Sequence, residues 1–260
     1  MKKILQLLEA NRDRGSFRVK AEEGSDEATI YVYGAIGDYY GIDAQTFVRE
    51  LAAIEASTIH LRINSPGGDV FAARAMKTAL EQHAAKVVAH IDGLAASAAS
   101  FLMLAADEIE ISEGAFVMIH LPWTFAVGSA DDLRASAAVL DKVGEAIVGD
   151  YVRRTGKDAD EVLAWMKAET WFTADEAVAE GFCDRKAGET AAPADPEQEE
   201  PPQEPAEPDQ EAPPASNLFD LSAYRNAPRA LKQRARTHFD ALAADRQRAE
   251  ARLALIERAA

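Results

Sequence analysis

The feature that most constrains the fold of this chain is a threefold alternation of strand and helix patterns. Short apolar runs, bounded by glycine, proline or charged residues, alternate with amphipathic stretches of helical period. Strands are expected at 28–36, 58–63 and 87–91, and helices at 43–56, 70–83 and 97–106. Strands that alternate with helices build parallel sheets through βαβ crossovers, so we expect a layered α/β protein.

The pattern continues with two short strands and one long helix. The strands are expected at 108–111 and 116–119, on either side of a Glu113-Gly114 turn. The helix is expected at 130–154, which exceeds what a compact α/β layer usually requires. We therefore expect this helix to project as an arm that meets another subunit, in a homo-oligomer.

Charge and cysteine content exclude several classes of function. The 260-residue chain has a formal net charge of −16, which argues against nucleic acid as the main ligand. It has no apolar run near the ~20 residues of a membrane span, and a charge interrupts the apolar start of the chain early. We therefore expect a cytoplasmic protein without a membrane partner. The single cysteine, Cys183, excludes an internal disulfide and is expected to be buried, and we expect no metal and no cofactor.

Composition divides the chain into three parts. The stretch 187–216 holds eight of the eleven prolines and nine carboxylates without any lysine or arginine, so it is predicted to be an acidic disordered linker. It separates a folded domain, 1–186, from a basic tail, 217–260, that is rich in helix-forming residues. An apolar stripe from Leu231 to Ile256 gives this tail two open interpretations: a helix that binds a partner surface, or a solvated tail.

Chemistry-bearing residues follow three of the predicted strands. Ser97 lies among alanines where a strand meets a helix, so free backbone N–H groups of the first helical turn lie beside its hydroxyl. Taken alone, the small residues there could simply allow tight helix packing. Gly67 and Gly68 follow the second strand, and His120 follows the strand 116–119. Because the carboxyl ends of parallel strands share one edge of a sheet, we expect these residues to converge there, with His120 as a base for Ser97.

Four ordered motifs between residues 28 and 184 resemble those of the Clp-type serine peptidases. They are Ile63-Asn64-Ser65-Pro66-Gly67-Gly68, Gly93-Leu94-Ala95-Ala96-Ser97, Val117-Met118-Ile119-His120-Leu121-Pro122, and Phe172-Thr173-Ala174-Asp175-Glu176-Ala177 with Gly181-Phe182-Cys183-Asp184. The resemblance implies a ClpP/crotonase-like fold and a serine endopeptidase that works through an acyl-enzyme. It also implies homo-oligomeric rings that enclose the sites.

The resemblance also assigns roles to residues. It implies Ser97 as nucleophile, His120 as base, and the backbone N–H groups of Gly68 and Ala98 as donors to the oxyanion, with Gly67 at the substrate. The triad acid departs from the family pattern, because Glu169 stands where an aspartate is usual. Glu169 could instead be a solvated charge at a helix end, with Asp175 or Asp184 as the acid.

The linker and tail are similar to the architecture of Clp-like phage prohead proteases, which mature phage heads. That reading implies scaffold, capsid or portal proteins as substrates, a place inside the assembling prohead, and self-cleavage within the linker. Two alternatives remain: a peptidase that works with an ATPase, and a catalytically degenerate assembly scaffold. A Ser/Lys peptidase is disfavoured because Lys77 and Lys86 are expected as surface charges, and a crotonase-like acyl-CoA enzyme would not need Ser97 and His120 together.

Overall fold

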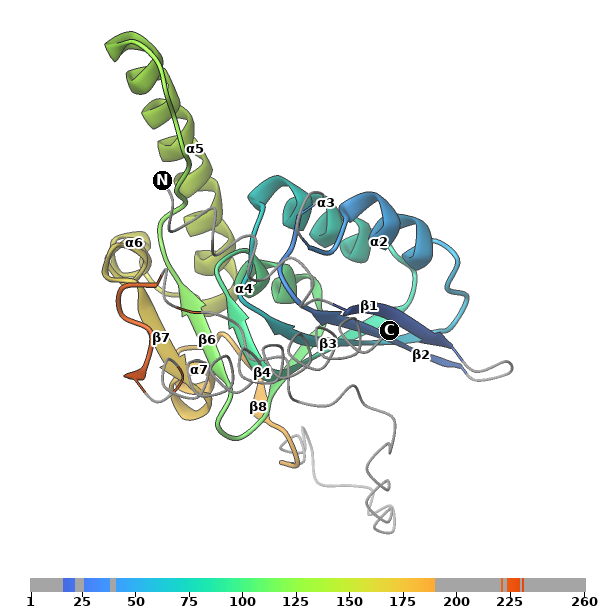
Figure 1. The fold of residues 1–260 in the computed structure, drawn as a ribbon. Helices are drawn as coiled ribbons and strands as arrows, with labels where there is room; N and C mark the ends of the chain where they lie inside the picture. Colours follow the sequence, from blue (N-terminus) through green and yellow to red (C-terminus); the bar gives the residue numbers. More distant parts are fainter. Residues whose placement is uncertain are drawn as a thin grey trace, which may run out of the picture.

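The computed structural model describes residues 16–21, 26–37, 41–189, 221, 224–229 and 231. Within these residues an eight-stranded mixed sheet forms the centre of the protein, with helices packed on one face (Figure 1). The strands are β1 (Ser16–Ala21), β2 (Glu27–Tyr33), β3 (Thr58–Ser65), β4 (Lys86–Ala96), β5 (Glu108–Ile111), β6 (Phe116–Ile119), β7 (Thr170–Thr173) and β8 (Arg185–Lys186). The helices are α2 (Ala44–Leu51), α3 (Val70–Glu81), α4 (Ala98–Leu102), α5 (Ala130–Thr155), α6 (Ala159–Ala168) and α7 (Ala174–Ala179), with a 3-10 turn at Met103–Ala105.

The strand order confirms the predicted α/β class. The main path runs β1-β2-β3-β4-β5-β8, and β6 lies beside β4 and carries β7 on its other side. From β2 to β8 along this path, and between β4 and β6, all pairs are parallel. The pairs β1–β2 and β6–β7 are antiparallel and were not predicted from the sequence. The sheet is therefore mixed, with a parallel centre.

Alternating side chains give the sheet two different faces. In β3 the residues Ile59, Leu61 and Ile63 are fully buried against α2 and α3, whereas His60 and Arg62 point to the opposite face. This period-2 pattern is the one from which the strand was predicted. The helix-covered face holds the main core, and the opposite face remains available to other parts of the chain.

Strand β4 runs further than the sequence indicated, and this extension positions the nucleophile candidate. The predicted strand ended at residue 91, but β4 continues to Ala96 because its last residues pair with β6. Its pairing with β3 shifts by two residues, since Ile63 pairs with Ile91 but Ser65 pairs with Ala95. A shift of two preserves the alternation of faces, so Ala95 stays in the main core.

The helix bounds differ from the predicted ones at their ends. The predicted helix 97–106 is the short α4 followed by a 3-10 turn, and it begins one residue later than predicted because the backbone of Ser97 is not helical. The predicted helix 43–56 is α2, which ends at Leu51, and Asp43 caps it by accepting hydrogen bonds from two backbone amides. Helix α5 spans 26 residues and extends away from the body of the protein (Figure 1).

The predicted linker 187–216 lies almost entirely outside the described residues, as does most of the predicted tail 217–260, so these domain boundaries stay predictions. The few described tail residues pack on the domain. Leu221 and Ala227 are buried in a second apolar cluster with Leu94, Ala96 and Met118, which lie on the sheet face opposite the main core. None of the described helices combines the length and apolar character needed to cross a bilayer.

Candidate active site

Ser97 sits in a sharp turn between β4 and α4. Its backbone has φ 54° and ψ −123°, a conformation that costs a residue with a Cβ on the order of 1–3 kcal/mol. The turn places Ser97 immediately before the first helical amide, that of Ala98. Amides of a first helical turn have no partner within their helix, so the N–H of Ala98 is available beside the serine. Strain stored at this one position is typical of a functional residue.

His120 contacts Ser97 directly. Its Nε2 lies 2.8 Å from the Ser97 Oγ, which is hydrogen-bond distance. The sheet brings the two residues together, because Ala96 at the end of β4 pairs with Met118 near the end of β6. Each residue follows the end of its strand, as the sequence indicated.

Two linked hydroxyl groups, those of Ser100 and Tyr151, support the Ser97 turn on the side of its backbone carbonyl. The Ser100 hydroxyl lies 2.6 Å from the carbonyl oxygen of Ser97 and 2.6 Å from the hydroxyl of Tyr151 on α5. Ser100 and Tyr151 are both buried, and burial raises the pKa of Tyr151, so its phenol keeps its proton. Helix α5 thus holds the carbonyl side of the strained turn in place. No local pattern in the sequence indicated this contact.

The glycine loop after β3 packs tightly against the same turn. Gly67 has φ +86°, and a Cβ at this position would lie 2.7 Å from the Ser97 Cβ and 2.8 Å from the Ala98 nitrogen. Gly68 has φ +152° and bridges to Ile36. That bridge uses the Gly67 carbonyl and the Asp69 amide, so the N–H of Gly68 is not part of it. Both glycines are required by space as well as by backbone angle.

Glu169 ends α6 and lies near His120 without a hydrogen bond to it. It has φ 53°, an unusual backbone angle for a glutamate. Among the described residues, its carboxylate accepts hydrogen bonds from the backbone amides of Arg225 and Asn226 and, at 3.4 Å, from the indole of Trp171. His120 is not among these donors, but the negative charge of Glu169 acts on the imidazole electrostatically and raises its pKa.

Two opposing effects set the basicity of His120. Burial lowers the pKa of His120 below its ordinary value, and the negative charge of Glu169 acts in the opposite direction. The imidazole is therefore neutral at neutral pH. In that state its ring nitrogen is able to accept the proton of the Ser97 hydroxyl.

The other candidates for the acid are occupied elsewhere. Asp175 pairs with Lys186 at 2.8 Å. Asp184 accepts a hydrogen bond from the Ile109 amide at 2.7 Å and pairs with Arg154 at 2.9 Å. Neither carboxylate contacts His120 within the described part of the chain. Of the three acids considered from the sequence, Glu169 is the one whose charge acts on the histidine.

The two lysines considered from the sequence pair with carboxylates. Lys86 is half-exposed and pairs with Glu108, as expected for a strand-edge charge. Lys77 was expected on the helix surface, but it is buried, and its ammonium pairs with Glu81 one turn along α3. The expectation for Lys77 was wrong because helices flank α3 on both sides, so that more than one stripe of this helix is covered.

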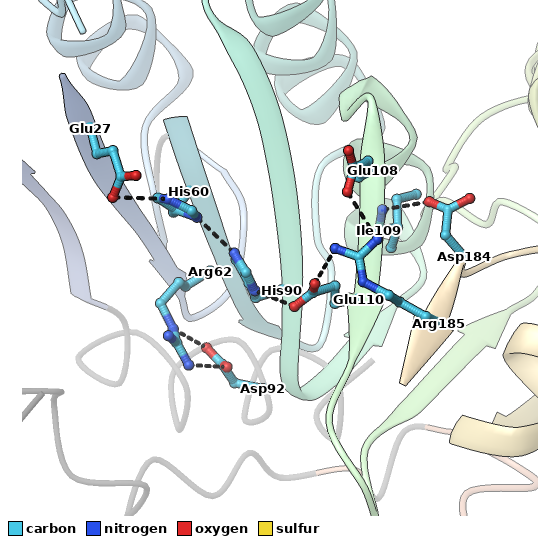
Figure 2. A network of polar contacts seen from close by, with 10 residues as sticks. All are labelled: Glu27, His60, Arg62, His90, Asp92, Glu108, Ile109, Glu110, Asp184 and Arg185. Atoms are coloured by element: carbon cyan, nitrogen blue, oxygen red, sulfur yellow. Dashed lines mark hydrogen bonds and ion pairs between the residues drawn. The ribbon is translucent and has the colours of Figure 1, made fainter. Parts of the chain in front are cut away.

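Two histidines that sit within strands form a polar network on the sheet face opposite the main core (Figure 2). The Nδ1 of His60 lies 2.9 Å from the Nε2 of His90, and the other nitrogens of the two rings approach Glu27 and Glu110. Arg62 forms a two-pronged ion pair with Asp92 beside them. These histidines satisfy local hydrogen bonds and take no part in the Ser97 site.

Cys183 is buried, as the sequence indicated. Burial raises the pKa of its thiol to about 12. The thiolate, which is the reactive form, is therefore scarcely populated at neutral pH. No group of histidine, cysteine and carboxylate side chains suited to a metal occurs among the residues that the structure describes.

Tyr224 is the site residue that sequence reasoning missed. Its ring packs edge-on against His120, with centroids 5.6 Å apart, and against Trp171 at 5.8 Å. Its hydroxyl donates a hydrogen bond to the carbonyl of Pro66, in the glycine loop. The apolar stripe starting at Leu231 suggested a partner surface for the tail, but nothing in the pattern pointed to a tyrosine at the catalytic histidine candidate.

A small apolar pocket opens beside Ser97. It lies between α3, α4 and α5. Its lining consists of Val70, Ser97, Ala98, Phe101, His120, Pro122, Ile147 and Tyr151.

The site holds a strained serine that is hydrogen-bonded to a neutral histidine at the carboxyl edge of a layered α/β sheet. This is the arrangement of a serine hydrolase. A model of the family described as Clp protease matches residues 22–188. The chain belongs to the Clp protease family, and the Clp-type serine peptidase expected from the sequence is confirmed. The expected enzyme class, a serine-type endopeptidase, is confirmed with it.

The chain is also similar to individual proteolytic subunits. It is 33% identical over 128 residues to ATP-dependent Clp protease proteolytic subunit 1 of Leifsonia xyli, covering 48% of this chain and 65% of that protein. It is 30% identical over 158 residues to the ATP-dependent Clp protease proteolytic subunit of Bacteroides fragilis, covering 60% of this chain and 76% of that protein.

Proposed function

We propose that the chain hydrolyses peptide bonds with Ser97 as nucleophile, His120 as general base and Glu169 as the acid that stabilises the charged imidazole. The backbone N–H groups of Gly68 and Ala98 stabilise the oxyanion, and Gly67 lies along the substrate backbone. The observation that supports this most is the 2.8 Å contact between Ser97 Oγ and His120 Nε2, made by a serine with φ 54°.

The proposed reaction has two halves. In the first, the Ser97 Oγ attacks the peptide carbonyl carbon while its proton passes to His120 Nε2, and His120 then gives this proton to the departing amine. In the second, water attacks the acyl-enzyme, its proton passes to His120, and the carboxylic acid product leaves as the proton returns to Ser97. The lowered pKa of His120 keeps the base in its reactive form at neutral pH.

The test is covalent labelling by a fluorophosphonate, which reports an activated serine directly. Wild-type protein is expected to take up the label, and Ser97→Ala and His120→Ala are expected to lose it. Asp175→Asn, which removes a surface ion pair remote from His120, serves as a control and is expected to label at the wild-type rate. Equal labelling of wild type and Ser97→Ala refutes the assignment.

We propose further that this peptidase is a phage prohead protease that cleaves scaffold, capsid or portal proteins inside the assembling head. The support is the acidic proline-rich composition of 187–216 followed by the basic tail, an architecture that places a separate binding element after the peptidase domain. Incubation with the capsid and scaffold proteins encoded beside it is expected to yield fragments only when Ser97 is present.

A homo-oligomer in the form of a ring is part of the same proposal. The outer part of α5 and the loop before it expose large apolar side chains, and such patches commonly mark protein interfaces. These side chains are Trp123, Phe125, Val127, Leu133 and Val139. Analytical ultracentrifugation that compares the oligomeric state of wild type and Val139→Asp tests this. The variant is expected to shift toward the monomer.

A peptidase that works with an ATPase is the second candidate. It is favoured by the names of the relatives, which are proteolytic subunits of ATP-dependent proteases. The two candidates differ in their requirements. Degradation of a folded protein only after an unfolding ATPase is added supports the second candidate, and cleavage of capsid or scaffold proteins without it supports the first.

A further inference from the structure

We infer that the sheet face beside Ser97 is a docking site for the segment of the same chain that carries Leu221, residues 224–229 and Leu231, and that the docked segment blocks the active site with Tyr224. This inference rests on the proposed peptidase function. The structure describes residues 221, 224–229 and 231 of this docking segment. Their contacts carry the argument.

The surface that receives the docking segment is apolar. Leu94 and Ala96 at the end of β4, together with Met118 on β6, lie on the sheet face opposite the main core. Leu221 and Ala227 are buried against them, at 5% and 7% exposure, and Leu231 packs on the same cluster. Without this segment, the face next to the catalytic residues would expose an apolar patch.

Tyr224 anchors the segment at the reacting groups. Its ring lies edge-on against both His120 and Trp171. Its hydroxyl donates to the Pro66 carbonyl, one residue before Gly67. Burial raises the pKa of Tyr224, so the phenol keeps the proton that it donates to Pro66. The ring thus lies against His120, whose Nε2 is the hydrogen-bond partner of the Ser97 hydroxyl.

The same segment occupies the carboxylate of Glu169. The backbone amide of Arg225 donates to Glu169 Oε2 at 2.8 Å, and the amide of Asn226 donates to Oε1. The Asn226 side chain donates to the carbonyl of Ala168, the preceding residue. A carboxylate held by two amides of the segment is not directed at His120. Docking therefore places a ring against His120, the partner of Ser97, and occupies the acid at once.

The pose indicates an inhibitor and not a substrate. Peptide cleavage requires a backbone carbonyl carbon within reach of Ser97 Oγ. Here the group packed against His120, the hydrogen-bond partner of Ser97, is a side-chain phenol, which has no carbonyl to attack. The backbone of Arg225 and Asn226 is turned toward Glu169. A segment bound in this way fills the site without being cut there.

Hydrogen exchange tests the docking without any reference to activity. The amides of Arg225 and Asn226 are expected to exchange at least about tenfold more slowly than in an unstructured peptide, and Tyr224→Ala is expected to remove this protection. A control variant is Tyr33→Phe, which deletes a hydroxyl that donates to Asp92 at 2.6 Å on another part of the sheet. Exchange at the unstructured rate in wild-type protein overturns the docking.

Fluorophosphonate labelling tests the blockade. We expect Tyr224→Ala to label about tenfold faster than wild type, because the site is open in a larger fraction of molecules. Tyr224→Phe, which loses only the bond to Pro66, is expected to fall between them, and Tyr33→Phe to match wild type. Equal rates for wild type and Tyr224→Ala overturn the blockade while leaving the peptidase assignment intact.

Two further outcomes separate the blockade from its premise. If none of these chains takes up the label, the proposed peptidase function fails and the blockade fails with it, whereas the docking is still decided by exchange. If mass spectrometry finds a cut within 221–231 that depends on Ser97, the segment is a substrate and its inhibitory role is overturned. An intact segment in purified wild type supports the inhibitory role.

Discussion

The backbone amide of Ser97 donates a hydrogen bond of 2.9 Å to the carbonyl of Met118. This bond extends the β4–β6 pairing by one step, beyond the match of Ala96 with Met118. It fixes the distance between the turn that carries the serine and the strand end that carries His120. The two reacting side chains are thus aligned by backbone pairing, which is more rigid than side-chain packing alone.

The strain at Ser97 predicts an unusual order of stabilities. Glycine usually destabilises a protein relative to alanine, but at φ 54° and ψ −123° alanine retains the steric conflict of a Cβ and glycine does not. We expect Ser97→Gly to be more stable than Ser97→Ala by about 1 kcal/mol. Urea unfolding of the two inactive variants measures the difference. An alanine variant that is the more stable contradicts a strained turn.

The acid assignment predicts a linked change in rate and pH profile. Because Glu169 also holds the docking segment, the comparison is made in chains that carry Tyr224→Ala. Glu169→Gln is expected to lower kcat/KM by about 10²–10⁴. It also removes a charge that raises the pKa of His120. The acidic limb of the pH profile of kcat/KM, which follows this pKa, should therefore move to lower pH. Asp175→Asn should change neither quantity, and an unmoved limb in Glu169→Gln excludes Glu169 as the acid.

The sequence predicted those parts of the site that local patterns encode. Ser97 and His120 follow apolar strands, and the glycines at 67 and 68 mark a turn, so topology alone was sufficient to expect them at one edge. The parallel centre of the sheet followed from the same alternation. These inferences needed only short-range periodicity and the handedness of βαβ units.

The missed features depend on contacts between distant residues. β4 extends to Ala96 because of its pairing with β6, which a pattern within β4 does not contain. The tail contact of Tyr224 with His120 joins residues more than 100 positions apart. The burial of Lys77 likewise depends on the helices that surround α3. No local composition rule contains such information.

The partly buried His90 on the sheet predicts a change of stability with pH. Burial lowers the pKa of His90 below 6.5, an effect that Glu110 partly opposes, with His60, Arg62 and Asp92 also nearby. The unfolded chain therefore binds a proton more readily, so stability from this group is complete above about pH 6.5 and is lost as the pH falls.

The expected slope is at most about 1.4 kcal/mol per pH unit for this one group. The free energy of unfolding, measured in urea at a series of pH values from neutral to mildly acidic, should fall less steeply in His90→Gln than in wild type. A variant with the wild-type slope shows that His90 does not remain neutral in the fold.

The ion pair between α5 and α3 predicts a large stability loss on truncation. The Asp150 side chain is 2% exposed and pairs with Arg74 of α3 and with Arg153. Asp150→Ala leaves Arg74 without its buried partner, and we expect a loss of about 2–3 kcal/mol in the free energy of unfolding. Asp131→Ala removes an exposed pair with Arg134 and should have no measurable effect. Equal effects contradict a structural role for Asp150.

The contact between the glycine loop and the nucleophile turn predicts that space, and not backbone angle alone, makes Gly67 essential. Gly67→Ala places a Cβ 2.5 Å from the Ala96 carbonyl oxygen and 2.7 Å from the Ser97 Cβ, so the turn must move. Gly114→Ala is the matched control, because Gly114 has a similar φ of +78° but no heavy atom within 4 Å of the new Cβ. The control should lose about 1 kcal/mol from strain and label normally with fluorophosphonate. Gly67→Ala should lose at least twice that stability and nearly all labelling, whereas equal behaviour of the two variants means that the loop does not brace Ser97.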